Sequence, residues 1–78
     1  MPTIIRVGPY RFFFYSNEVA EPQHVHVQRD RALANFWINP VEIASSAGFP
    51  AHELSKLRKL VLEHESRFKE AWNEYFGD

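Results

Sequence analysis

The stretch HVHVQRDRALANFWI, residues 24–38, decides the fold of this 78-residue chain. Its first five residues alternate between polar and apolar side chains, which is the pattern of a half-buried β-strand. Residues 29–31 follow as a turn, and the apolar segment Ala32–Ile38 returns beside the first strand. The sequence therefore predicts a β-hairpin at the centre of a sheet.

The register of this hairpin follows from the length of its turn. If Asp30 and Arg31 are the two turn residues, each residue of the first strand has a definite partner on the second. The expected pairs are His24 with Trp37, Val25 with Phe36, His26 with Asn35, Val27 with Ala34, and Gln28 with Leu33. Because side chains alternate between the two faces of a sheet, His24, His26, Asn35 and Trp37 should share one face, and the apolar residues the other.

Three further segments read as strands. Thr3–Val7 is short and β-branched, and Tyr10–Ser16 is aromatic on both faces. A polar loop is expected at residues 17–22. After the hairpin, Val41–Ala44 predicts a short edge strand, and residues 45–49 are expected to form a loop.

The second half of the chain has the apolar spacing of a helix. Pro50 suits the first helical position, and an apolar stripe follows at intervals of three and four residues, formed by Leu54, Leu57, Val61, His64, Phe68, Trp72 and Tyr75. One helix over residues 51–76 would be about 39 Å long. This is long for so small a sheet, so two alternatives are open: the helix breaks near residues 64–66, or its end extends beyond the sheet and pairs with another chain. Gly77 is expected to end the helix.

These elements define the fold class. We expect an α+β domain in which an antiparallel sheet of four to five strands precedes one long C-terminal helix packed on one face. Residues 1–78 form a single domain, with a sheet half over residues 1–45 and a helical half over residues 50–76.

Composition excludes several classes of protein. Hydrophobic residues make up 45% and charged residues 24% of the chain, as in folded globular proteins. Cysteine is absent, which excludes disulfides and thiolate zinc sites. The chain has neither an apolar run long enough to cross a membrane nor a secretory signal, so the cytoplasm is its expected location. With three glycines, a phosphate-binding glycine loop is also excluded.

His24 and His26 are the strongest candidates for chemistry. Two imidazoles two residues apart on a strand project from the same face, as proton transfer or metal ligation requires. A catalytic zinc site usually needs three protein ligands, and the third would have to come from Glu21, His52 or His64. A direct catalytic pair, a metal site and a purely structural role all remain open.

Arginine supplies every positive charge in the first half of the chain. Residues 1–40 hold four arginines and three acidic residues, whereas residues 41–78 hold five basic and seven acidic ones. Arg6, Arg11, Arg29 and Arg31 are candidates for a phosphate-binding rim. Arg11 shares its strand face with Phe13 and Tyr15, and such interleaving favours single-stranded RNA. The alternative is that the two arginines of the turn only solvate the hairpin tip, and the net charge of −1 argues against RNA.

The C-terminal end of the helix is rich in aromatic residues. Because the helix is longer than the sheet it covers, Trp72 and Phe76 are expected to form an exposed patch in a monomer. Such a patch would bind a partner protein or a second copy of the chain.

The whole pattern resembles a bacterial protein family. The chain carries, in order, Met1-Pro2-Thr3-Ile4, YRFFFYS at residues 10–16, Glu21-Pro22 followed by His24-Val25-His26-Val27, Ala34 with Phe36-Trp37, Pro40-Val41, Gly48-Phe49, Glu53-Leu54 and Trp72-Asn73-Glu74-Tyr75-Phe76. In this it resembles the family called domain of unknown function 4160. The resemblance implies the toxin component of a toxin–antitoxin pair, with a small antitoxin protein as partner.

From the residues and this resemblance, the leading hypothesis is a toxin that acts on RNA as a metal-independent endoribonuclease without a cofactor. One of His24 and His26 would be the general base and the other the general acid. The expected substrate contacts are Arg11 and Arg29 for the phosphate, Trp37 or Tyr15 for a base, and Asn35.

Two rival hypotheses assign the chain to other classes. In the first, the protein is a non-enzymatic binding module that docks a partner through Trp72 and Phe76. In the second, it is a hydrolase that binds a metal through its histidines.

Overall fold

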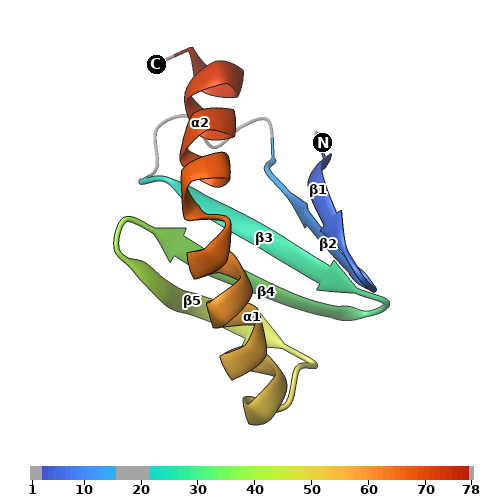
Figure 1. Ribbon diagram of the computed structural model, residues 1–78. Coiled ribbons are helices and arrows are strands. Elements are labelled where there is room, and N and C mark those ends of the chain that lie inside the picture. The colour runs from blue at the N-terminus through green and yellow to red at the C-terminus, as the bar shows by residue number, and fades with distance from the viewer. Residues whose placement is uncertain (1–2, 16–21, 78) are drawn as a thin grey trace.

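A computed structural model describes residues 3–15 and 22–77 (Figure 1). Within these ranges the chain forms β1 (Thr3–Val7), β2 (Tyr10–Phe13), β3 (His24–Arg29), β4 (Ala32–Ile38), β5 (Val41–Ala47), α1 (Ala51–Glu63) and α2 (Glu65–Phe76). The strands form one sheet in the order β1-β2-β3-β4-β5, and each neighbouring pair is antiparallel. Both helices cross the same face of the sheet (Figure 1). The predicted α+β fold is confirmed.

The central hairpin has the predicted register. His24 pairs with Trp37 and His26 with Asn35, and Arg29 pairs with Ala32, so that only two residues form the turn. The first of these, Asp30, has a φ of 55°. A left-handed conformation is what a tight two-residue hairpin requires, and aspartate tolerates it better than most residues.

Two strand boundaries differ from the prediction. β2 ends at Phe13, and the rest of its predicted extent includes Ser16, which lies outside the described residues, as does most of the predicted loop at residues 17–22. β5 continues to Ala47, where a loop was predicted. The reason is β4, which is seven residues long and supplies partners as far as Leu33, opposite Ala47. The register shifts between the Ser45 and Ile43 pairs, so Ala44 lies at a β-bulge.

Of the two alternatives for the long helix, the structure shows the break, which lies at His64. α1 ends at Glu63 and α2 begins at Glu65, and the backbone of His64 has φ −107° and ψ 18°. The backbone N–H of His64 still donates to the carbonyl of Leu60 at 3.1 Å, and the N–H of Phe68 donates to the carbonyl of His64 at 3.0 Å. The chain therefore continues in nearly the same direction. Helix α2 is capped by Gly77, whose φ of 77° is the left-handed conformation of a helix C-cap.

The hydrophobic core lies between the sheet and the helices. The sheet contributes Phe12, Val25, Val27 and Phe36, and the helices contribute Leu57, Val61 and Phe68, all completely buried. The rings of Phe12 and Phe68 lie 5.3 Å apart between centroids.

Trp72 also belongs to this core, which corrects the prediction that it is exposed. Its side chain is only 5% exposed, and its ring packs edge to face on Phe14 at 5.1 Å. Phe76 is half-buried against Trp72, with the centroids 4.2 Å apart. The sheet extends far enough to cover this part of α2, so the expected patch is not formed around Trp72.

Candidate functional site

The strand register gathers most of the predicted site residues on the face of the sheet opposite α1 and α2, which we call the distal face. The strand residues whose side chains share this face are Thr3, Arg6, Arg11, Phe13, His24, His26, Gln28, Leu33, Asn35, Trp37, Glu42, Ser45 and Ala47. They come from all five described strands. The sheet therefore brings together residues that lie far apart in the sequence.

His24 and His26 lie in an aromatic cluster on this face. Both side chains are 4% exposed, and their rings contact edge to face with centroids 5.1 Å apart. The ring of His26 stacks on Phe13 at 5.4 Å and meets the edge of Tyr15 at 4.4 Å. His24 lies against Trp37 at 5.6 Å, on the neighbouring strand. The prediction that His24, His26 and Trp37 share one face is confirmed, and Tyr15 contacts this group as well.

Each histidine is also held by a hydrogen bond at Nδ1. In His24 this nitrogen lies 2.8 Å from the backbone carbonyl oxygen of Pro22. A carbonyl can only accept, so Nδ1 carries the proton and the lone pair of the neutral ring is at Nε2. In His26 the partner of Nδ1 is the side-chain oxygen Oδ1 of Asn35.

Arg6 and Arg11 form a pair of like charges on the distal face. They lie directly opposite each other on β1 and β2. Arg11 donates from Nε to the hydroxyl of Thr3 at 2.8 Å, and its guanidinium lies 4.4 Å above the ring of Phe13. Within residues 3–15 and 22–77, no ion pair involves either arginine. Like charges directly opposite each other destabilise a sheet, so this pair favours an anion between or above the two side chains.

Arg29 lies on the other face, which corrects its place in the predicted rim. Its guanidinium donates to both carboxylate oxygens of Glu53 on α1, at 2.7 and 2.9 Å. The Tyr10 hydroxyl donates to the same carboxylate at 2.7 Å. These hydrogen bonds, from Arg29 first and then Tyr10, lower the pKa of Glu53, and the bond to Glu53 raises the pKa of Tyr10. Arg29 therefore holds α1 against the sheet, away from His24, His26 and Arg11.

The described residues offer no metal site. No group of three among the histidines, aspartates and glutamates of residues 3–15 and 22–77 is placed to hold an ion. Two of the candidate ligands, His52 and His64, lie in α1 and at its C-terminal end, and neither has a described ring contact with His24 or His26. Glu21 lies outside the described residues.

No helix within residues 3–15 and 22–77 is both long enough and apolar enough to cross a membrane.

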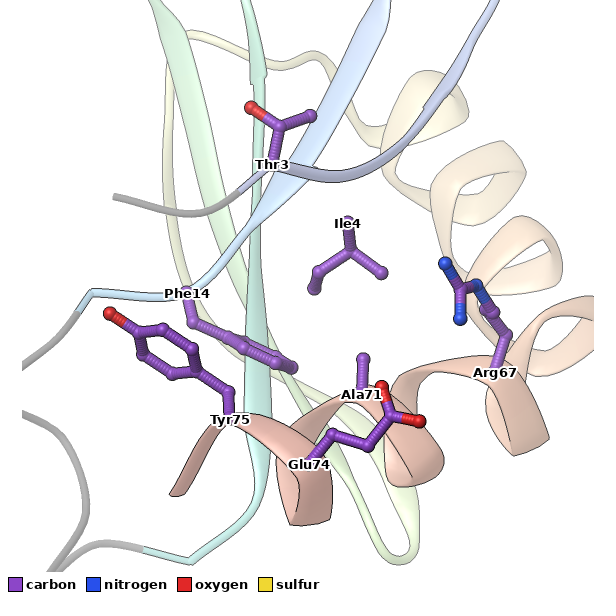
Figure 2. A pocket seen from close by; sticks show the side chains of 7 residues that line it. All are labelled: Thr3, Ile4, Phe14, Arg67, Ala71, Glu74 and Tyr75. Carbon is purple, nitrogen blue, oxygen red and sulfur yellow. The ribbon is translucent and has the colours of Figure 1, made fainter. Parts of the chain in front are cut away.

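On the helix side of the sheet, two cavities are lined by described residues. The larger, of about 280 Å³, opens between β1 and α2 and is lined by the apolar side chains of Ile4, Phe14 and Ala71, with Arg67 and Glu74 at its margin (Figure 2). The smaller, of about 210 Å³, lies between β5 and α1. Neither is lined by His24, His26 or Trp37, so neither forms part of the histidine cluster.

Sequence reasoning did not identify two members of the cluster. Trp72 contacts His24 with ring centroids 5.3 Å apart, so the ring of His24, the first residue of β3, lies against α2 as well as against its neighbours on the distal face. Ser45 accepts a hydrogen bond from the Asn35 side chain at 2.9 Å. Its place on a strand could have been inferred only by extending β5 opposite the whole length of β4.

Comparison with known proteins identifies the family. The family model described as Domain of unknown function (DUF4160) matches residues 10–73. The chain belongs to this family. The match to DUF4160 runs from β2 into α2 and includes His24, His26, Asn35 and Trp37. A search of curated proteins and a search of solved structures found no significant match.

Proposed function

We propose that this DUF4160 protein is a toxin that binds single-stranded RNA on its distal face and cleaves it with His24 and His26. The observation that carries the proposal is the meeting of a histidine pair, an arginine pair and partly exposed aromatic rings on one face of a sheet. Each of these three features has a separate role in RNA recognition and cleavage.

Binding would use charge and stacking together. Arg6 and Arg11 offer two guanidinium groups to the phosphate backbone. The rings of Tyr15 and Trp37 are half-buried, which leaves part of each surface for a base to stack on. The net charge of −1 is compatible with this because the acidic excess lies in the second half of the chain. Among the strand residues on the distal face, Glu42 is the one acid against two arginines.

Cleavage would follow the proton-transfer chemistry of the two imidazoles. One neutral histidine takes the proton from a ribose 2′-hydroxyl, and the 2′-oxygen attacks the adjacent phosphorus. The bond from phosphorus to the 5′-oxygen breaks, and the other, protonated histidine donates a proton to that oxygen. The products are a 2′,3′-cyclic phosphate and a 5′-hydroxyl. Imidazole is the side chain that most often serves as general acid or base in catalysis.

The geometry of the pair limits how RNA can approach. Because the two rings are in edge-to-face contact, a phosphate cannot enter between them. It would have to lie over the pair, and because both side chains are only 4% exposed, RNA binding would have to uncover an edge of each ring.

The toxin role is supported by the family resemblance and can be tested in cells. In this proposal the partner of the protein is a small antitoxin protein. Induced expression of the wild type in a bacterial host is expected to arrest growth with fragmented RNA, whereas His24→Ala/His26→Ala is expected to do neither. Growth arrest with intact RNA would support the toxin role and contradict the proposed ribonuclease activity.

The direct test uses purified protein and a labelled single-stranded RNA of mixed sequence. The wild type should bind and cleave, Arg6→Gln/Arg11→Gln should lose binding, and His24→Gln/His26→Gln should bind without cleaving. Arg58→Gln, an exposed arginine of α1, is the matched control and should behave as wild type. Circular dichroism checks that each variant is folded. Cleavage by His24→Gln/His26→Gln would contradict the proposed mechanism. Wild-type affinity for RNA in Arg6→Gln/Arg11→Gln would show that the two arginines do not bind the RNA.

A further inference from the structure

β1 (Thr3–Val7) is an end strand of the sheet. It pairs with β2 on one side, and its outer side has no partner among the described strands. In an antiparallel pair, alternate residues of a strand point their backbone N–H and C=O groups away from the partner strand. The outer side of β1, which we call the β1 edge, therefore presents a row of donors and acceptors to which an extended peptide can bind.

On the distal face, the β1 edge carries positive charge without an acidic partner. Arg6 is exposed and lies directly opposite Arg11 on β2, and no described ion pair involves either residue. Like charges directly opposite each other destabilise a sheet, whereas opposite charges stabilise it. An aspartate or glutamate opposite Arg6 on an added strand would therefore offset the repulsion between the two arginines.

On the helix side, the same edge borders an apolar cavity. Ile4 of β1 and Ala71 of α2 lie on opposite sides of this space of about 280 Å³ (Figure 2). The ring of Tyr75, which is 44% exposed, lies at its margin. Arg67 and Glu74 also line it, and their opposite charges give the cavity no preference for either sign. An apolar side chain placed there would remove the exposed surfaces of Ile4 and Tyr75 from water.

A single strand can satisfy both sides of the β1 edge. Successive side chains of a strand point to opposite faces of the sheet, so a strand that alternates acidic and apolar residues would direct acids toward Arg6 and apolar groups toward the cavity. We propose that the β1 edge is the docking site for an extended segment of a partner protein in which acidic and apolar residues alternate. This rests on the proposed function only where the partner is called an antitoxin.

The opposite edge of the sheet fits such a segment less well. β5 is the other end strand, and a cavity of about 210 Å³ lies between it and α1. The charged side chain that β5 places on the distal face is Glu42, which would repel an acidic strand. A second copy of the chain does not supply the segment through its own β1, because Thr3–Val7 contains no acidic residue.

Docking at the β1 edge would also affect the proposed RNA site. Arg6 lies on the distal face, so an acidic residue paired with it would compete with the phosphate backbone of RNA. A bound segment should therefore weaken RNA binding about as much as Arg6→Gln does. In this way an antitoxin would inhibit the toxin by occupying the edge strand next to the histidine cluster.

The test uses the purified protein and a short, fluorescently labelled peptide in which glutamate and leucine alternate, with both peptide ends blocked. Fluorescence anisotropy should show that the wild type binds this peptide. A peptide of the same composition in which the alternation is broken, and one with lysine in place of glutamate, should bind at least about tenfold more weakly. Methylation of the backbone nitrogens along one edge of the alternating peptide should weaken binding further, because that edge then has no N–H groups to donate.

Two pairs of variants locate the bound peptide. Arg6→Glu should weaken binding of the glutamate peptide about tenfold and strengthen binding of the lysine peptide, and its new carboxylate faces Arg11, which favours folding. Arg58→Glu on α1 is its matched control. Ala71→Leu fills the larger cavity and should weaken binding about 10- to 100-fold, whereas Ser55→Leu, which fills the smaller one, should not. Circular dichroism checks that each variant is folded.

Several results would overturn the proposal. These are no binding of the alternating peptide by the wild type, equal affinity for the lysine peptide, or losses confined to Arg58→Glu and Ser55→Leu, which would place the peptide at β5. Self-association of the wild type that Glu42→Gln abolishes, measured by sedimentation, would show that β5 of a second copy occupies the β1 edge instead. If the protein neither binds nor cleaves RNA, the proposed function fails, but the peptide measurements still decide whether the β1 edge is a docking site.

Discussion

Arg11 and Arg29 have the same side chain on neighbouring strands, yet they lie in opposite environments. Arg29 faces α1, where the carboxylate of Glu53 takes up its charge at two oxygens. Arg11 faces away from the helices, where its described polar contact is the neutral hydroxyl of Thr3. The positive charge of Arg29 is thus used within the fold, whereas that of Arg11 has no acidic partner among the described residues.

The Arg29–Glu53 contact predicts how stability depends on pH. Because its pKa is lowered in the folded state, Glu53 stabilises the protein fully above the pKa of an unpaired glutamate, about 4.3, and this contribution is lost as the pH falls through the lower folded value. Glu53→Gln should lower the melting temperature by several degrees at pH 7, and the difference from wild type should shrink in acid. Thermal unfolding followed by circular dichroism from pH 7 to pH 3 measures both effects.

Glu42→Gln is the matched control for this prediction. Glu42 is an exposed glutamate of β5, on the face opposite Glu53, and no described ion pair involves it. Its removal should leave the melting temperature nearly unchanged at every pH. If the difference in melting temperature between wild type and Glu53→Gln is as large at pH 3 as at pH 7, the stabilisation does not come from the ionised carboxylate of Glu53.

Gly48 connects β5 to α1 in a conformation that other residues rarely adopt. Its φ is +90°, and a Cβ added there would lie 3.1 Å from Cα of Ala32. We expect Gly48→Ala to destabilise the protein by about 3 kcal/mol, from backbone strain and the forced displacement of β4. Gly8→Ala tests strain alone, because its φ is +57° but nothing lies within 4 Å of the added carbon. That variant should cost about 1–2 kcal/mol in urea unfolding. Equal losses in the two variants would show that the contact with Ala32 is unimportant.

At the scale of elements, the strands and helices that were predicted correctly are those determined by residues close together in the sequence. The hairpin of β3 and β4 follows from alternation and a two-residue turn, and the helices follow from apolar spacing. The end of β5 could not be predicted in this way. Residues 44–47 read Ala-Ser-Ser-Ala, which has little strand preference, and they are held in the sheet by pairing with β4.

For α2, Trp72 likewise shows what the spacing of apolar residues cannot predict. Its position on the apolar stripe was correctly inferred, but spacing alone does not say how far the sheet extends beneath it. Trp72→Ala should therefore destabilise the protein by about 3–5 kcal/mol, as expected for a large buried side chain. Tyr75→Ala, one turn further along and 44% exposed, should cost about 1 kcal/mol or less. Urea unfolding compares the two variants, and a small loss for Trp72→Ala would show that this side chain is not part of the core.

At the scale of the whole molecule, the candidate site depends on the order of the strands. The alternation of residues 24–28 predicted that the two histidines share a face, and the turn length placed Asn35 and Trp37 beside them. The pairing of Arg6 with Arg11 required the register of β1 on β2, which includes a bulge that no local pattern indicates. Arg29 is absent from the face because β3 continues one residue beyond Gln28, and the alternation of side chains then directs Arg29 toward α1.

Because Arg6 and Arg11 share the distal face and Arg29 does not, we can predict how the affinity for RNA depends on salt concentration. Each phosphate neutralised on a single strand contributes about −0.7 to the slope of log K against log salt concentration. If Arg6 and Arg11 each contact one phosphate, the wild type should bind single-stranded RNA with a slope of about −1.4, and Arg6→Gln or Arg11→Gln should reduce its magnitude by about 0.7. Arg58→Gln on α1 should leave the slope unchanged. Fluorescence anisotropy at several salt concentrations measures all four proteins. A slope that changes only in Arg58→Gln would place the RNA on the helices, and a slope near zero in the wild type would mean that the distal face binds something other than a phosphate backbone.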